Sequence, residues 1–219
     1  ESFLAERISE FESTLPPSIT LAYLPNYGMV KLRLSTRGNN PGMVAKLEAE
    51  FDMLKQQVAD VMIVDEDKSI QQVVADILVK NQQTLSTAES CTGGYIAQLI
   101  TAMPGSSNFY QGGVVAYSND LKEKLIGVNH GTLEKNGAVS RETVIEMAEG
   151  VRRQSDSDFA IATSGIMGPD GGSPEKPVGS VWVGVASRTE SEAHQYQFRF
   201  DRQRNIELTA TYGLNTLRK

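Results

Sequence analysis

The chain has 219 residues, 40% of them apolar and 22% charged, and a formal net charge of -6. This size suits one large or two small globular domains. The acidic balance argues against a broad interface with nucleic-acid phosphates, and the apolar runs are far shorter than the roughly 20 residues of a membrane-spanning helix. A single cysteine, Cys91, excludes an internal disulfide and a thiolate-cluster metal site. We therefore expect a cytoplasmic protein without a membrane anchor.

Residues 1–66 have the pattern of a small α+β domain. Apolar spacing predicts helices over residues 3–15 and 41–60 and strands over 19–25, 28–36 and 61–67. The strands 19–25 and 28–36 are joined by the turn PNYG, and Pro41 suits the first turn of its helix. The chain begins without Met, and we expect it to be a fragment of a longer protein. Nothing in this segment has the spacing of a catalytic site.

Residues 67–219 alternate helices and strands, which predicts a layered α/β domain. We expect helices over 69–81, 91–103, 118–127, 140–154 and 204–219, and strands over 84–90, 112–117, 158–165, 180–187 and 194–200. Ser69 and Gln72 form a capping box for the first of these helices. A Gly/Pro-rich loop over 165–179 is longer than the usual connection, which indicates a functional or mobile segment. His130 lies in an expected turn.

Tyr117 and Lys122 are a first candidate pair. Tyr117 ends an expected strand and Lys122 lies in the first turns of the next helix, so both lie towards one edge of the sheet. The chain has only two histidines, and neither lies near a serine nucleophile motif, so a neutral lysine is the natural base for a serine. A tyrosine at the rim of the core beside a solvated lysine is the alternative, which the residues alone favour.

Ser90, Thr92 and Gly93 lie where an expected strand passes into a helix. Backbone N–H groups at a helix start bind anions, and glycine lets a ligand come close. Cys91 is a candidate nucleophile there, because such positions lower the pKa of a thiol. Alternatively, Ser90 and Thr92 only cap the helix, and the residue types leave the two interpretations even.

Three loops supply further candidate binding residues: Gly105, Ser106 and Ser107, then Ser164 and Gly165, and finally Arg202. The first loop has the composition of an ordinary turn after Pro-Gly. The second follows a strand end, where ligands bind in layered α/β sheets, although a purely structural loop is the alternative. Arg202 lies between the last strand and the last helix, where it either clamps a phosphate or pairs with Asp201.

Several motifs converge on one family: TAESCTGG, GSSNFYQGGVVAYSNDLKEKLIGV, GAVS, SGIMGPDGGSPEKPVGSVWVG and FDRQRN. Together, over residues 67–219, they closely resemble the C-terminal domain of the CinA (competence/damage-inducible) family, a nicotinamide mononucleotide deamidase of the PncC type. Residues 1–66 resemble the KH-like module that precedes this domain in full-length members. The N-terminal molybdopterin-binding-like domain of the family is missing from the sequence.

The resemblance implies hydrolysis of the nicotinamide mononucleotide carboxamide to nicotinic acid mononucleotide and ammonia, with no metal or organic cofactor. It implies Ser107 as the nucleophile, Lys122 as its base and Tyr117 as an assisting group. Ser90 would contact the amide, and Arg202 would hold the phosphate. The rest of the substrate site would be lined by Thr92, Gly93, Gly105, Ser106, Ser164 and Gly165. A homodimer is expected.

Two alternatives remain. The first keeps the substrate and makes Cys91 the nucleophile. The second is a non-catalytic nucleotide- or partner-binding module linked to competence or DNA damage, which the intact Ser/Tyr/Lys set disfavours. We expect no direct nucleic-acid binding, because residues 1–66 lack a GxxG loop with basic flanks.

Overall fold

The computed structural model describes residues 2–26, 28–38 and 40–219. The chain divides into two compact units, Glu1–Asp67 and Lys68–Lys219. The sequence places the boundary one residue earlier, between residues 66 and 67. In the part of the chain that the structure describes, no helix is long and apolar enough to cross a membrane.

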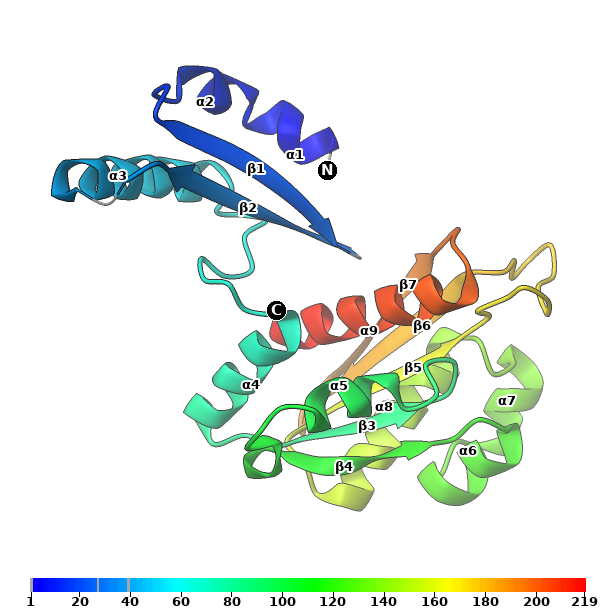
Figure 1. Cartoon of the computed structure of the whole chain (residues 1–219). Helices are drawn as coiled ribbons and strands as arrows, with labels where there is room; N and C mark the ends of the chain where they lie inside the picture. Colours follow the sequence, from blue (N-terminus) through cyan, green and yellow to red (C-terminus); the bar gives the residue numbers. More distant parts are fainter. Residues whose placement is uncertain (1, 27, 39) are drawn as a thin grey trace. The chain divides into compact units, whose positions relative to one another are not determined.

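The first unit pairs a two-stranded sheet with helices (Figure 1). Its elements are α1 (Ser2–Arg7), α2 (Ser9–Thr14), β1 (Ile19–Asn26), β2 (Met29–Thr36) and α3 (Pro41–Gln57). The two strands are antiparallel. The buried core of this unit consists of Ile8, Phe11, Leu54 and Val58. Because α2 and α3 both contribute to this core, their apolar residues recur at helical spacing.

The first unit differs from the sequence prediction in two of its expected elements. The helix expected over residues 3–15 is interrupted at Ile8, which leaves helical geometry between α1 and α2. The strand expected over residues 61–67 is wrong, because that segment forms turns and bends. Tyr27, in the turn expected between the two strands, lies outside the described residues.

The second unit is built on a five-stranded sheet with the order β4-β3-β5-β6-β7 in the described chain. The strands are β3 (Leu85–Glu89), β4 (Tyr110–Val115), β5 (Phe159–Gly165), β6 (Ser180–Ala186) and β7 (Ser191–Gln197). Strands β4, β3 and β5 are parallel, whereas β5, β6 and β7 are antiparallel neighbours. The fold is therefore mixed α/β, and β6 and β7 form the strand pair that their sequence predicts.

Helices cover both faces of this sheet, as the layered prediction requires (Figure 1). They are α4 (Ile70–Asn81), α5 (Tyr95–Thr101), α6 (Asn119–Ile126), α7 (His130–Asn136), α8 (Arg141–Ser155) and α9 (Arg202–Arg218). Small strand residues such as Ala88 and Ala162 pack in one core cluster with Met147 of α8. Gly213 of α9 approaches Ile161 from the opposite face.

Helix starts follow the sequence signals closely. Ser69 and Gln72 form the predicted capping box of α4, and the Ser118 and Ser140 side chains cap α6 and α8. His130 is an exception, because it begins the short helix α7 rather than a turn; the Asn129 side chain caps that helix.

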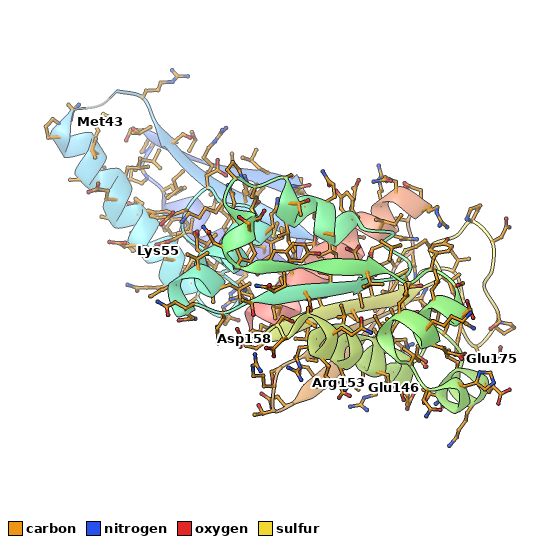
Figure 2. The ribbon with its side chains drawn as sticks, turned by 90° about the horizontal axis from the view of Figure 1, so that it is seen from below. Met43, Lys55, Glu146, Arg153, Asp158 and Glu175 are labelled. Atoms are coloured by element: carbon orange, nitrogen blue, oxygen red, sulfur yellow. The ribbon has the colours of Figure 1, made fainter. Side chains whose placement is uncertain are left out.

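The amino and carboxyl ends of the parallel strands carry different residues. Where β3 and β5 begin, the Asp158 carboxylate (labelled in Figure 2) accepts hydrogen bonds from Thr84 N and Oγ1 at 2.9 Å and pairs with Arg188. This network holds the two strand starts together. The opposite edge, where β3, β4 and β5 end, carries most of the candidate residues.

Candidate active site

A serine and a lysine meet at the carboxyl edge of β3. Lys122 Nζ, on the first turn of α6, lies 3.0 Å from Ser90 Oγ, which directly follows β3. Ser90 is 8% exposed and Lys122 1% exposed. The backbone N–H of Ser90 donates to Thr163 O at 3.0 Å, which extends the β3–β5 pairing and fixes the serine at the strand end.

The Lys122 amine has two further partners, both backbone carbonyls. It donates to Ala116 O at 2.9 Å and to Tyr117 O at 3.2 Å. No carboxylate forms an ion pair with it among the described residues. Burial therefore dominates and lowers the pKa of Lys122 below the usual lysine value.

Ser107 lies at the other end of β4. It is an exposed residue of the 3₁₀ turn Ser106–Asn108, which precedes β4, whereas Lys122 follows that strand. The strand separates the two residues by its own length, roughly 20 Å at about 3.3 Å per residue. The expected pair of Ser107 and Lys122 is thus not formed, and Gly105 and Ser106 stand at the same distant edge.

Ser90 and Thr92 do not cap helix α5. Thr92 Oγ1 bonds Thr163 Oγ1 at 2.7 Å and Ser90 Oγ bonds Lys122, so neither side chain caps α5. Gly94 occupies the cap position, and Gly93 and Gly94 have φ of 62° and 97°, a region that favours glycine. The helix start is closed by the buried Glu89 carboxylate, so it offers no open anion site.

Cys91 has the opposite chemistry from that of an activated nucleophile. The residue is 5% exposed, and burial raises the pKa of its thiol to about 12. A buried thiol of this kind holds little thiolate near neutral pH and is inert. The structure therefore disfavours the alternative in which Cys91 attacks the substrate.

Tyr117 and Arg202 meet across the end of the sheet. Arg202 Nη2 donates to Tyr117 Oη at 3.1 Å, and Arg202 Nη1 donates to Gly168 O at 2.8 Å. Tyr117 follows β4 and Gly168 follows β5, so this bridge crosses the end of β3, which lies between them and bears Ser90. The phenol bonds Arg202 rather than Lys122, and Arg202 bonds Gly168 O and Tyr117 Oη, whereas Asp201 pairs with Arg204.

The long loop between β5 and β6 is held at its start. The buried Ser164 Oγ donates to Ala138 O at 2.7 Å, and Gly165 packs so closely against β6 that an added Cβ would lie 2.8 Å from Ser180 O. Asn205 Nδ2 donates to Met167 O at 3.1 Å. Glu175, farther along the loop, is labelled in Figure 2.

Sequence reasoning missed four contributors: Glu89, Thr163, the Ala116 carbonyl and Asn205. The signal for Glu89 was a charged residue that ends an otherwise uncharged strand immediately before a glycine-rich turn. The carbonyl of Ala116 leaves no sequence signal at all. Within the described ranges, no group of three or more His, Cys, Asp or Glu side chains could hold a metal ion.

Comparison with known proteins gives one consistent family. A family model described as the CinA C-terminal domain matches residues 67–219. CinA-like proteins from Cytophaga hutchinsonii and Amoebophilus asiaticus are 40% and 41% identical over 220 residues. Each match covers 100% of this chain and 53% of the relative. The chain therefore spans about half the length of these curated relatives.

Solved structures agree with the sequence matches. The competence/damage inducible protein CihA from Agrobacterium tumefaciens is 37% identical with a TM-score of 0.65, and the match covers 68% of this chain and 94% of that one. A CinA superfamily protein from Escherichia coli is 31% identical with a TM-score of 0.66, over 71% of this chain and 88% of its own.

Proposed function

Because the chain belongs to the CinA family, we propose that it is an amidohydrolase that converts nicotinamide mononucleotide to nicotinic acid mononucleotide and ammonia. The nucleophile is Ser90 and its base is Lys122. This assignment replaces Ser107, the nucleophile expected from the sequence, with Ser90, the serine that Lys122 contacts.

The observation that carries the proposal is the hydrogen bonding of the Lys122 amine. A neutral amine has two N–H donors and one lone pair, and it has three partners here. The carbonyls of Ala116 and Tyr117 can only accept, so they take the two N–H groups. The lone pair then faces Ser90 Oγ and can accept the serine proton, which is the arrangement that a general base requires.

The reaction proceeds in two halves. Lys122 takes the Ser90 proton while Oγ attacks the amide carbon and forms a C–O bond. When the C–N bond breaks, Lys122 returns the proton to the departing nitrogen, and ammonia leaves an ester on Ser90. Lys122 then takes a proton from water, the hydroxide attacks the ester, and the proton returns to Ser90 as the acid is released.

The oxyanion that forms during each attack needs preorganised N–H donors. The backbone N–H of Thr92 donates to no protein acceptor within the described ranges. It lies two residues after the nucleophile, in the tight turn that Gly93 and Gly94 permit. We therefore expect it to stabilise the oxyanion.

Arg202 is the proposed phosphate ligand. A guanidinium has five N–H donors, and the bonds to Tyr117 Oη and Gly168 O use only one on each Nη atom. The remaining donors suffice for the paired hydrogen bonds that arginine makes with phosphate. The bond to Gly168 O fixes the plane of the guanidinium before a ligand arrives.

The decisive experiment measures ammonia release from nicotinamide mononucleotide by the wild type, Ser90→Ala and Ser107→Ala. We expect Ser90→Ala to lose at least about 10³-fold in kcat, as removal of a nucleophile does. Ser107→Ala is the matched control and should keep wild-type kcat, since it lies at the distant sheet edge.

Each other result has a distinct meaning. Activity that survives in Ser90→Ala and is lost in Ser107→Ala would overturn the assignment of the nucleophile. No release by the wild type would overturn the amidohydrolase proposal and favour a non-catalytic nucleotide-binding module.

A further inference from the structure

Glu89 is a fully buried carboxylate immediately before the proposed nucleophile. It is 1% exposed and ends β3. Its Oε2 accepts hydrogen bonds from Gly94 N at 3.1 Å and Ile96 N at 3.0 Å, and its Oε1 accepts from Ala97 N at 2.8 Å. Three backbone donors of the first turn of α5 therefore converge on one side chain.

The alternation of a strand separates Glu89 from Ser90. Successive side chains point to opposite faces, so Glu89 reaches α5 while Ser90 reaches Lys122 of α6. The backbone between them is also held, because Glu89 O accepts from Ala116 N at 2.9 Å and Ser90 N donates to Thr163 O. The position of Ser90 is thus fixed by contacts with α5 and α6 on the two faces of the sheet and by backbone hydrogen bonds on both sides of β3.

The turn over residues 90–94 needs an external anchor. Its cap residue, Gly94, has no side chain, and α5 has only 7 residues, too short to be stable by itself. A carboxylate at a helix start satisfies otherwise unpaired N–H groups and complements the positive end of the helix dipole. Glu89 supplies that carboxylate from the strand.

We propose that Glu89 is a positioning residue for catalysis: it ties the start of α5 to the end of β3 and so holds Ser90 Oγ at the distance at which Lys122 can take its proton. This inference rests on the proposed Ser90–Lys122 chemistry. It does not require that the substrate be a nicotinamide nucleotide.

The charge and the two acceptor oxygens of Glu89 are both required. In Glu89→Gln one oxygen becomes an NH₂ group, which faces backbone N–H donors and cannot accept from them. The turn must then shift to separate donor from donor. A displacement of about 1 Å at a reacting group costs on the order of 10²-fold in rate.

The test compares the 219-residue wild type with Glu89→Gln and Ser86→Ala. Ser86 is the matched control, because it lies on β3 like Glu89, four residues before Ser90, and its buried hydroxyl bonds Ser157 Oγ at 2.8 Å. Three quantities are measured: Tm, kcat and KM for ammonia release, and the rate at which a fluorophosphonate labels Ser90, located by peptide mass spectrometry. The labelling reports serine reactivity without the substrate.

We expect Glu89→Gln to lower kcat and the labelling rate by roughly 10–100-fold, with KM within about 3-fold because Arg202 is untouched. Ser86→Ala should lower Tm and leave kcat and labelling unchanged. If Glu89→Gln does not fold, Glu89→Asp replaces it, since it keeps the charge but withdraws the oxygens by one methylene; the same pattern is expected.

The inference is overturned if a Glu89 variant has a lower Tm but keeps the wild-type kcat and labelling rate below its melting temperature. Glu89 would then have only a structural role. Failure of the proposed function is separate: the wild type would release no ammonia, and the labelling rates would still decide the role of Glu89. Absence of both ammonia release and labelling in the wild type overturns both.

Discussion

Lys122 must be neutral to act as a base, and burial favours that state by lowering its pKa from the usual value of 10.5. Below the folded-state pKa, both folded and unfolded chains hold the proton, and the folded chain bears the full cost of a buried ammonium. Between the folded-state pKa and 10.5, the unfolded chain binds more protons, so stability rises with pH. Above 10.5 the cost has disappeared.

This sign gives a measurable prediction. As the pH rises towards 10.5, the Tm of the wild type should rise relative to that of Lys122→Met, whatever their difference at the start. Lys124→Met is the control on the same helix, because its hydrogen bond to Asp120 raises the pKa of that exposed lysine. Thermal melts followed by circular dichroism suffice. A Tm difference for Lys122→Met that stays as flat as the control contradicts a depressed pKa.

The phosphate role of Arg202 predicts a change in substrate preference. Loss of hydrogen bonds to a charged group costs about 1.5–3 kcal/mol, or roughly 10–100-fold. Arg202→Ala should therefore raise KM for the mononucleotide by that factor and change KM for nicotinamide riboside little. Arg204→Ala, which removes an arginine paired with Asp201 at 3.4 Å on the same turn, should change neither. Equal effects of Arg202→Ala on both substrates would rule out the phosphate clamp.

At the scale of elements, α8 packs against α6, the helix that carries Lys122. Gly150 of α8 lies so close to the end of α6 that an added Cβ would stand 1.8 Å from Ile126 O. Glycine to alanine in a helix usually stabilises by up to about 1 kcal/mol. Here the clash with a backbone atom reverses the sign.

Gly150→Ala should therefore destabilise the second unit by about 1–3 kcal/mol, which corresponds to a fall in Tm of roughly 2–10 °C. Gly213→Ala in α9 is the matched control, since its Cβ would lie 3.4 Å from Ile161, an ordinary contact, and should keep or raise Tm. Denaturant unfolding of both variants measures the difference. A Gly150→Ala protein as stable as the wild type would refute the close approach of α8 to α6.

Local patterns predicted most elements because local rules decide them. The apolar spacing and the Ser69–Gln72 capping box specify α4 without reference to the rest of the chain. The strand expected over residues 61–67 failed for the converse reason: β-rich composition forms a strand only where a partner strand can pair with it. Helix α7 was missed because a single Asn129 cap on seven residues carries little periodicity.

The site was less predictable than the fold, since it depends on which side chains become neighbours in space. Ser107 lies 15 positions before Lys122 and Ser90 lies 32 before it, yet a parallel crossover brings the distant serine to the lysine and carries the nearer one away. The burial of Lys122 likewise has no signature in its polar helix. Tyr117 and Arg202 were expected in the site, but their contact was not.

For the whole molecule, the division into two units gives the last prediction. Each proposed site residue lies in the unit Lys68–Lys219, which has its own sheet and core. The Agrobacterium tumefaciens structure matches 68% of this chain and 94% of its own, so nearly all of that solved chain corresponds to about two thirds of this one. We expect residues 68–219 to fold alone and to release ammonia with the kcat and KM of the full chain, within about 2-fold. The comparison pairs ammonia assays with thermal melts of both proteins, and Ser90→Ala in the short chain measures the background. A short chain that folds but loses more than about 10-fold in kcat, near 1.4 kcal/mol, would show that residues 1–67 take part in the reaction.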